Sequence, residues 1–340
     1  MRRRRLRNGP ALTMIDVAKH AGVSAQTVSR ALGRPDLVAA ETLDKVRKAV
    51  NALGYIPNEA ARNLASSRSR TVAVIIPTLA SSAYAAQVVR VVEVMESRDI
   101  QVVIGNSEYS PEREENLIRS FLERRPLGFI VTGLHHTPAS RELLLGSGVP
   151  VIETWDTDGT PIDTAVGFSN LDVGRDVGRL FLSSGRIRAA FIGGRAALDP
   201  RATGRYEGLA EVFEAAGRER PLRIELSLPM SALDGVTGLD EVLQRAPLTQ
   251  AIMFSADSIA IGALLDCVRR GIAVPEQLAI CGVGDYELAP MVTPALTTVR
   301  IFSELMGQRA AELLLARFDG EERDQARVDT GHQLIRRGSA

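Results

Sequence analysis

One short segment near the amino terminus carries side chains that suit contacts with DNA: Ala25, Gln26, Thr27, Ser29 and Arg30. A glutamine can form two hydrogen bonds with adenine, an arginine can do the same with guanine, and an alanine can touch the methyl group of thymine. Serine and threonine hydroxyls suit phosphate groups, which fix the register of a protein on DNA without reading its sequence. The alternative is an ordinary solvated helix face in another α-helical domain, and the spacing alone does not decide between the two.

Two short helices across a glycine turn are predicted to position these side chains. Thr13 and Asp16 have the spacing of a capping box that opens the first helix, and Gly22 can end that helix in a left-handed conformation. Ser24 is placed to cap the second helix. We expect the apolar positions of both helices to face a common core: Ile15, Val17, Ala18, Ala21, Val28, Ala31 and Leu32. This is the plan of a helix-turn-helix, whose second helix enters the major groove of DNA.

The charge of the chain is unevenly distributed, although the formal net charge of its 340 residues is zero. Residues 1–70 contain 14 Lys and Arg but only 5 Asp and Glu, so the remainder of the chain is acidic. A basic head on an acidic body indicates that one end meets a polyanion. Arg2–Arg5 is interpreted either as a basic arm that contacts DNA or as a solubilising tail.

Beyond the two short helices, the sequence predicts a third helix at Glu41–Leu53, which Gly54 ends. Three short helices complete a small DNA-binding headpiece over residues 1–57. Asn58 then caps a last helical stretch, Glu59–Ser66, and a linker rich in serine and arginine follows up to residue 70. Residues 58–70 are therefore predicted to connect the headpiece to a larger body.

From Thr71 onward, short apolar runs alternate with helix-like segments, which is typical of βαβ units and doubly wound parallel sheets. The apolar fraction of 45% provides enough side chains for a large core. The predicted fold class is α/β: an all-α helix-turn-helix headpiece followed by a two-lobed body over residues 71–340 with a doubly wound parallel sheet in each lobe. The expected strands are Val72–Ile76, Val102–Ile104, Gly128–Val131 and Val149–Ile152, then Ala189–Gly193, Arg223–Ser227, Ala251–Phe254 and Leu278–Val283.

Several classes of protein are disfavoured. No apolar run approaches the length that crosses a membrane, and no signal-peptide segment follows the first arginines, so we expect a cytoplasmic protein without membrane association. The chain has no Walker motif, no dinucleotide-binding glycine motif and no metal-ligand cluster, and its histidines (His20, His135, His136 and His332) lack the context of a catalytic triad. Cys267 and Cys281 are interpreted as buried apolar residues. We therefore expect no enzyme, cofactor or metal. A sugar-binding protein without a regulatory role remains an alternative, but it would not need residues 1–70.

The segments TMIDVAKHAGVSAQTVSRAL and LGYIPNEAARNLAS, at this spacing, resemble the headpiece and hinge helix of the LacI/GalR family of bacterial repressors. The resemblance implies that Gln26 and Arg30 read bases, with Ala25 at a third, variable position. It also implies phosphate contacts for Thr13, Ser24, Ser29 and Asn58. Leu64 matches the leucine that enters the minor groove, although packing against the body is its alternative. Ala39-Ala40 stands where the family usually has a capping serine, which puts one phosphate contact in doubt.

The resemblance continues through the body, in Phe191–Gly194 (FIGG), Ala260–Leu265 (AIGALL), Gly271–Asp285 and Pro294–Val299 (PALTTV). It implies a body similar to a periplasmic sugar-binding protein, with one lobe formed by residues 71–169 and 302–331 and the other by residues 170–301 and 332–340. Because a lone headpiece makes few base contacts, we expect a homodimer on a palindromic DNA operator.

A small-molecule effector is expected between the lobes, because ligands of open parallel sheets bind beyond the carboxyl ends of the strands. Arg205 falls where the family places a ligand-binding arginine, whereas Arg201 has a surface arginine as its alternative. Trp155 can stack on a sugar or simply pack in the core. The residues assigned to the site are Ser81, Ser82, Tyr84, Thr132, Glu153, Trp155, Phe168, Arg201, Arg205, Asp257 and Asp285.

Two departures from sugar-responsive family members indicate an anionic effector. Ala256 replaces an asparagine, and Gly284-Asp285 stands where those members often have two acids. Losing an acid while keeping two arginines makes an anion easier to accept. Together with Glu153–Phe168, these features resemble the gluconate-type branch of the family. The predicted effector is a sugar acid such as gluconate or a phosphorylated relative, with a neutral sugar or a nucleobase as the alternative. The sign of the response does not follow from the residues.

Overall fold

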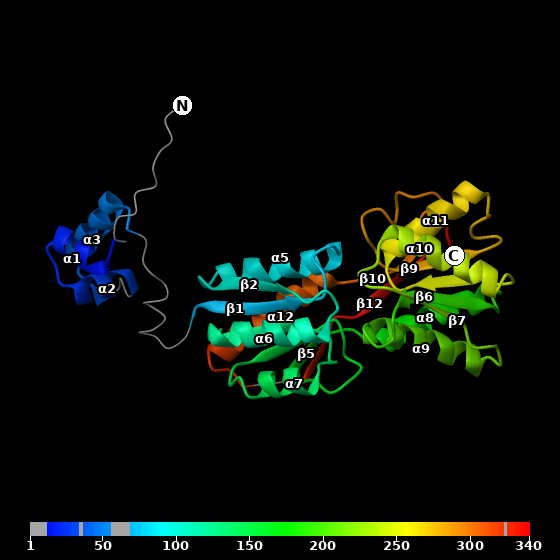
Figure 1. The fold of residues 1–340 in the computed structure, drawn as a ribbon, viewed down its shortest axis with the longest axis horizontal. Helices are drawn as coiled ribbons and strands as arrows, with labels where there is room; N and C mark the ends of the chain where they lie inside the picture. The colour runs from blue at the N-terminus through cyan, green and yellow to red at the C-terminus, as the bar shows by residue number, and fades with distance from the viewer. Residues whose placement is uncertain (1–11, 34–36, 56–68, 323–324) are drawn as a thin grey trace, which may run out of the picture. The chain divides into compact units, whose positions relative to one another are not determined.

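The computed structural model describes residues 12–33, 37–55, 69–322 and 325–340. The chain divides into two compact units, Met1–Ser67 and Arg68–Ala340, which are described separately below (Figure 1). The basic arm and the predicted hinge residues Asn58 and Leu64 lie outside the described residues, so their roles stay predictions. Across the described ranges, no helix combines the length and apolarity that a membrane span requires.

The headpiece contains three helices, α1 (Met14–Ala21), α2 (Ala25–Gly33) and α3 (Ala40–Leu53). The capping box of Thr13 and Asp16 is confirmed, and Gly22 ends α1 with a φ of 66°. Buried side chains from all three helices and the following Tyr55 form one small core: Val17, Ala18, Val28, Ala31, Val46, Ala49 and Tyr55. The headpiece therefore has the three-helix core that the sequence predicts.

Two details of the headpiece differ from the prediction. Ile15 is 59% exposed and does not join the core. The physical reason is helix geometry, because Ile15 lies roughly 200° around α1 from the fully buried Val17. The third helix begins at Ala40 rather than Glu41, and its N-cap residue, Ala39, makes no side-chain capping bond.

The body has two six-stranded sheets, one in each lobe. The N-lobe sheet has the order β11-β5-β4-β3-β1-β2, and its neighbouring strands run parallel to one another. Its strands are β1 (Thr71–Ile76), β2 (Gln101–Asn106), β3 (Gly128–Thr132), β4 (Val151–Thr154), β5 (Thr164–Gly167) and β11 (Arg327–Asp329). Its helices are α5 (Ser82–Glu96), α6 (Pro111–Glu123), α7 (Pro138–Leu145) and α12 (Ser303–Phe318).

The C-lobe sheet has the order β12-β10-β9-β8-β6-β7, in which only β12 runs antiparallel to its neighbour. Its strands are β6 (Ala189–Gly194), β7 (Leu222–Leu226), β8 (Ala251–Phe254), β9 (Ala279–Gly284), β10 (Thr297–Ile301) and β12 (His332–Ile335). Its helices are α8 (Asn170–Ser183), α9 (Pro200–Ala215), α10 (Ala232–Arg245) and α11 (Asp257–Arg270). The α/β class with a parallel sheet in each lobe is thus confirmed.

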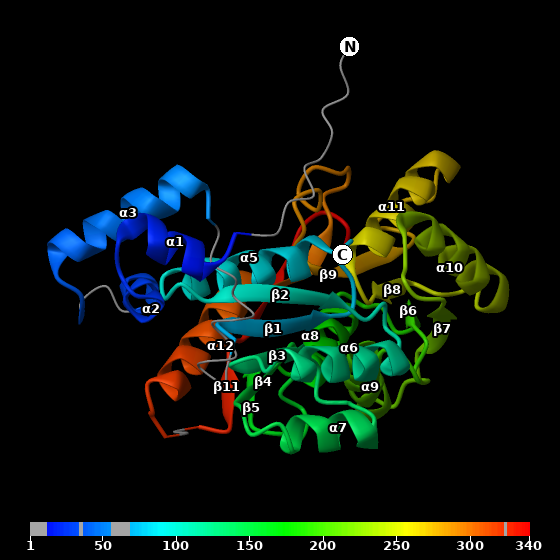
Figure 2. The same ribbon diagram turned by 60° about the vertical axis from the view of Figure 1, so that its left-hand side comes forward.

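Alternation along the central strands places helices on both faces of each sheet. In β1, Val74 and Ile76 face the core shared with α5 and α12, whereas Ala73 and Ile75 face α6 and α7. In β6, Phe191 belongs to the core on the α8–α9 side, whereas its neighbours Ala190 and Ile192 belong to the core on the α10–α11 side. Figure 2 shows the C-lobe sheet between these two helix pairs. Because both faces of these central strands are buried, their sequences are apolar throughout instead of alternating between apolar and polar residues.

The chain passes between the lobes three times: after β5, after β10 and between β11 and β12. Two of these crossings are joined, because the backbone N–H of Thr330 donates to the carbonyl oxygen of Gly167 at 2.7 Å. The side-chain hydroxyl of Thr330 donates to the same oxygen at 2.9 Å. These bonds hold the two connecting segments side by side.

Candidate functional site

Helix α2 presents the predicted base-reading side chains to solvent. Gln26, Ser29 and Arg30 are exposed, whereas Val28 on the opposite side is fully buried. Ser24 caps the helix, since its hydroxyl accepts from the backbone N–H of Thr27 at 3.1 Å. The arrangement fits a helix that lies in a DNA groove with Gln26 and Arg30 facing the bases.

Three of the other predicted DNA contacts have local roles. The hydroxyl of Thr27 lies 2.8 Å from that of Ser24, and the hydroxyl of Thr13 donates to Asp16 at 2.7 Å. The hydrogen bonds from Thr13 also hold the pKa of Asp16 below its usual value. Ala25 and Thr27 are half-buried, so they offer less surface than Gln26. Contact of any of these residues with DNA stays a prediction.

The body contains a cavity of about 250 Å³ between the lobes, lined by residues from both. Most of the predicted effector residues lie in its wall: Ser81, Ser82, Tyr84, Trp155, Phe168, Arg201 and Arg205. They come from the start of α5, the segments that follow β4 and β5, and the start of α9. The cavity therefore lies beyond the carboxyl ends of the strands, where ligands of parallel sheets usually bind.

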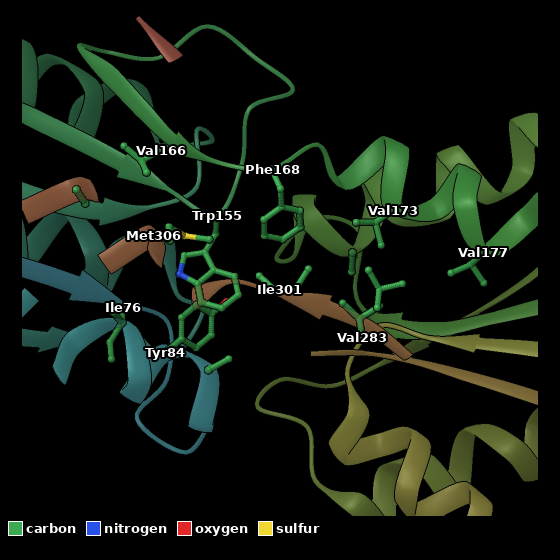
Figure 3. Close-up of a cluster of buried hydrophobic side chains, with 14 of the residues drawn as sticks. Ile76, Tyr84, Trp155, Val166, Phe168, Val173, Val177, Val283, Ile301 and Met306 are labelled. Carbon is green, nitrogen blue, oxygen red and sulfur yellow. The ribbon is translucent and has the colours of Figure 1, made fainter. Parts of the chain in front are cut away.

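An aromatic group forms the N-lobe wall of the cavity. The rings of Tyr84 and Trp155 lie 4.5 Å apart, and Phe168 meets Trp155 edge-on at 6.3 Å (Figure 3). The indole N–H of Trp155 donates to the side-chain oxygen of Gln87 at 2.6 Å. Because this bond uses its only polar group, Trp155 offers a ring surface to a ligand rather than a hydrogen bond. The core role and the cavity role of Trp155 coexist.

Two arginines one turn apart on α9 form the polar side of the cavity. Arg201 and Arg205 are each only 8% exposed. Arg201 donates to the hydroxyl of Tyr84 at 3.2 Å, which links the two lobes across the cavity. Arg205 donates to the side-chain oxygen of Asn170. Burial lowers the pKa of Arg205, but an arginine starts so high that its guanidinium stays charged at neutral pH.

The wall of this cavity carries more positive than negative charge. Its one carboxylate, Asp199, caps α9 by accepting from the backbone N–H of Ala202 at 3.1 Å. Two buried polar atoms of lining residues have no hydrogen-bond partner among the residues that the structure describes, the Nε of Arg205 and the Oγ of Ser255. Buried polar groups are normally paired, so these atoms point to a polar ligand, and the arginines favour a negatively charged one.

Two predicted effector residues of the N-lobe lie outside this cavity. Thr132 donates to the backbone of Ile75 at 3.1 Å and lines a smaller neighbouring cavity of about 60 Å³. Glu153 is fully buried inside the lobe, with an oxygen 3.4 Å from the Nε2 of His136. Burial would lower the pKa of His136, but Glu114 and Glu153 outweigh it and raise this pKa to about 9. Glu153 precedes the end of β4, so its side chain points into the lobe, whereas Trp155, past the end, reaches the cavity.

Two predicted residues of the C-lobe are also placed elsewhere. Asp257 is fully buried and accepts from the hydroxyl of Thr298 and from the backbone N–H of Tyr286. Burial raises the pKa of Asp257 to about 6. Asp285 forms ion pairs with Arg300 at 2.7 Å and Arg337 at 2.6 Å. Both carboxylates therefore serve the C-lobe itself, and neither lines the cavity.

Several lining residues are absent from the sequence prediction, notably Tyr109, Asp199, Ser255 and Tyr286. Tyr109 and Tyr286 follow β2 and β9, so the same rule about strand ends would have found them. Asp199 precedes Pro200 in a pattern that opens helices. The hydroxyl of Tyr286 lies 3.2 Å from that of Ser81, which gives a second link between the lobes across the cavity.

Comparison with known proteins places the two units in known families. Residues 13–58 match the model for bacterial regulatory proteins of the lacI family, and residues 179–340 match that for a periplasmic binding protein-like domain. The HTH-type transcriptional regulator GntR of Pseudomonas aeruginosa is 38% identical over 328 residues, which cover 96% of this chain and 95% of the relative.

Solved structures agree with this placement. A LacI-family transcriptional regulator from Silicibacter pomeroyi is 35% identical with a TM-score of 0.90, and the match covers 96% of this chain and 99% of that one. The lac repressor dimer bound to operator and an anti-inducer is 25% identical with a TM-score of 0.84, covering 97% of this chain and 99% of that one.

The fold and its two sites define a DNA-binding module joined to a two-lobed ligand-binding body. The chain belongs to the LacI family of bacterial regulatory proteins. It is a DNA-binding transcriptional regulator with an effector-binding domain, and it is not an enzyme.

Proposed function

We propose that this regulator is a repressor that binds a palindromic operator as a homodimer and that a sugar acid controls its affinity for DNA. Gluconate or a phosphorylated relative is the proposed effector. The observation that carries the proposal is the pair of buried arginines, Arg201 and Arg205, in a cavity whose one carboxylate already caps a helix. A carboxylate or phosphate would pair with these guanidinium groups and satisfy the free Nε of Arg205.

The remaining wall suits the polyol chain of a sugar acid. Ser81, Ser82, Tyr84 and Tyr286 supply hydroxyls that can exchange hydrogen bonds with sugar hydroxyls. The faces of Trp155 and its aromatic neighbours can cover the C–H surface of the ligand. The similarity to a relative named GntR is consistent with the gluconate-type branch that the sequence resembles.

A neutral sugar or a nucleobase is the second candidate. The observation in its favour is the aromatic wall of Tyr84, Trp155 and Phe168, against which either could stack. Neither would neutralise the two arginines, so we favour the anion.

Dimer formation is supported by apolar side chains that the C-lobe exposes. Leu265 and Val268, one turn apart on α11, are 53% and 54% exposed, and Leu233 on the neighbouring α10 is 77% exposed. A second copy of the chain would cover this surface. Two copies would also match a two-fold DNA site, as in the lac repressor dimer bound to operator.

The effector would act by shifting the balance between two arrangements of the lobes. Because the cavity wall comes from both lobes, a ligand binds more tightly to the arrangement in which both sets of side chains reach it. The predicted hinge, residues 58–66, would carry that change to the headpiece. The size of the response is limited by the difference in effector affinity between the two arrangements.

The test is a titration of a palindromic DNA with a central CG step by the full chain at fixed salt, with and without gluconate. We expect specific binding of two chains per palindrome and a change of affinity when gluconate is added, whose sign distinguishes an inducer from a corepressor. DNA binding that does not change with gluconate would reject gluconate as the effector and keep the repressor, and an absence of specific DNA binding would reject the operator-binding role of the headpiece. A stoichiometry of one chain would reject the dimer.

The base-reading role of α2 gives a separate prediction. We expect Gln26→Ala to cost about 1–3 kcal/mol on the preferred palindrome and to relax specificity at one base pair of each half-site. Ser29→Ala, at a predicted phosphate contact, should instead weaken binding to all DNA sequences by the same factor. Affinities for a set of single-base variants of the palindrome measure both. A Gln26→Ala protein that loses the same factor on every sequence would contradict the assignment.

A further inference from the structure

Asn170 lies behind the cavity wall, directly after the first crossing between the lobes. It is the first residue of α8, and its side chain is buried, with 1% of the residue exposed. Ser169 caps the helix by accepting from the backbone N–H of Asp172, so the position of Asn170 is fixed by the helix start. Asn170 does not line the cavity itself, and it is not among the effector residues that the sequence predicts.

Its side-chain amide joins two residues of the effector cavity that belong to different lobes. Arg205 donates to the Oδ1 of Asn170, and the Nδ2 of Asn170 donates to the backbone carbonyl oxygen of Trp155 at 3.0 Å. A guanidinium can only donate and a carbonyl can only accept. The orientation of the amide is therefore determined by its two partners, and reversing it would break both bonds.

The neutral charge of Asn170 matters because of the state of Arg205. Within the described part of the chain, Asp199 acts on Arg205 only at longer range, without an ion pair, and the Nε of Arg205 has no hydrogen-bond partner. An aspartate at position 170 would have nearly the same shape and could still accept from Arg205. It would, however, neutralise the guanidinium, and an ionised carboxylate could not donate to the carbonyl oxygen of Trp155.

We propose that Asn170 determines the charge preference of the effector site, as a positioning residue that orients Arg205 while leaving its positive charge for an anionic ligand. This inference rests on the proposed effector function, because it concerns the same cavity. Through its bond to Trp155, Asn170 also ties the arginine of one lobe to the aromatic wall of the other. Arg205 is thereby held in place before the ligand arrives, which reduces the entropy lost on binding.

Two substitutions of Asn170, ranked by their affinity for gluconate, distinguish this role from a merely structural one. Asn170→Ala removes both hydrogen bonds but leaves Arg205 charged, whereas Asn170→Asp keeps the shape and neutralises the charge. We expect Asn170→Asp to bind gluconate at least about tenfold more weakly than Asn170→Ala. A structural role predicts the opposite order, because the aspartate preserves the packing better. Gln244→Glu, the same change of amide to acid at an exposed position of α10, is the matched control and should bind as the wild type does.

The measurement is calorimetric titration of each full-chain variant with gluconate at neutral pH. Asn170→Asp binding as tightly as Asn170→Ala, or more tightly, would overturn the inference. If the wild type itself does not bind gluconate, the proposed effector fails, and the role of Asn170 is then decided by a measurement without ligand.

That second measurement is the melting temperature of Asn170→Asp in two backgrounds, the wild type and Arg205→Met. If residue 170 faces a charged arginine, the aspartate is paired in the first background and is a buried, unpaired carboxylate in the second. We expect the melting temperature to fall several degrees further in the Arg205→Met background. An equal fall in both backgrounds would overturn the inference whatever the effector is.

Discussion

Replacing Arg205 with methionine is expected to weaken gluconate binding about 100-fold or more and to remove the effect of gluconate on operator binding. Methionine fills a similar volume but carries no charge, and a charge-assisted hydrogen bond contributes roughly 1.5–3 kcal/mol. The effect should lie at or beyond the upper end of that range, because Arg205 is only 8% exposed and water cannot replace the lost partner. Calorimetry gives the effector affinity, and DNA titration with and without gluconate gives the response.

The matched control for this prediction is Arg195→Met. Arg195 lies on the segment between β6 and α9, just before the helix that carries Arg205, but it is exposed and does not line the cavity. The control should keep both the affinity and the response. The headpiece is a separate unit, so operator binding without effector should persist in both variants. A full response to gluconate in the Arg205→Met protein would show that Arg205 does not bind the effector.

Local patterns predicted most of the fold. The capping box of Thr13 and Asp16 and the left-handed glycine at Gly22 depend on neighbours within the same helix, and both are present. The long apolar strands such as β1 and β6 are buried on both faces and read clearly in the sequence. The strands β5, β10, β11 and β12 were not predicted, because each consists of five residues or fewer and pairs with a distant part of the chain.

The lining of the cavity between the lobes was predicted in part. Position after a strand found Trp155, Arg201 and Arg205, which line the cavity. The same rule also selected Asp257 and Asp285, whose carboxylates are held by Thr298 and by Arg300 and Arg337. These partners lie 41, 15 and 52 positions away. A sequence pattern shows that an acid follows a strand, but not which distant donor will occupy it.

A single methyl group at Gly208 is expected to destabilise the body by about 3 kcal/mol or more. Helices α8 and α9 cross with their backbones in close approach at two reciprocal positions. A Cβ on Gly208 would lie closer than 3.0 Å to the carbonyl oxygen of Leu171, and a Cβ on Gly174 would do the same to that of Arg205. Because backbone atoms are the obstacle, no side chain can rotate away, and the two helices would have to separate.

Gly204→Ala is the control for Gly208→Ala, because it lies one turn earlier on the same helix. Its new Cβ would be 3.2 Å from the Cβ of Asn170, a tight contact that needs only a small shift. Both substitutions gain the same helix propensity, roughly 1 kcal/mol, so the difference between the two variants isolates the backbone clash. Thermal unfolding should show a melting temperature at least about 5 °C lower for Gly208→Ala than for Gly204→Ala.

The same change should reach the effector site, since the distance between α8 and α9 sets the bond from Arg205 to Asn170. Gly208→Ala is therefore expected to weaken gluconate binding even at temperatures where the protein remains folded. Equal melting temperatures for the two alanine variants would mean that the helices can separate at little cost. In that case the close crossing of α8 and α9 does not hold Arg205 in place. The orientation of its guanidinium would then depend on Asn170 alone.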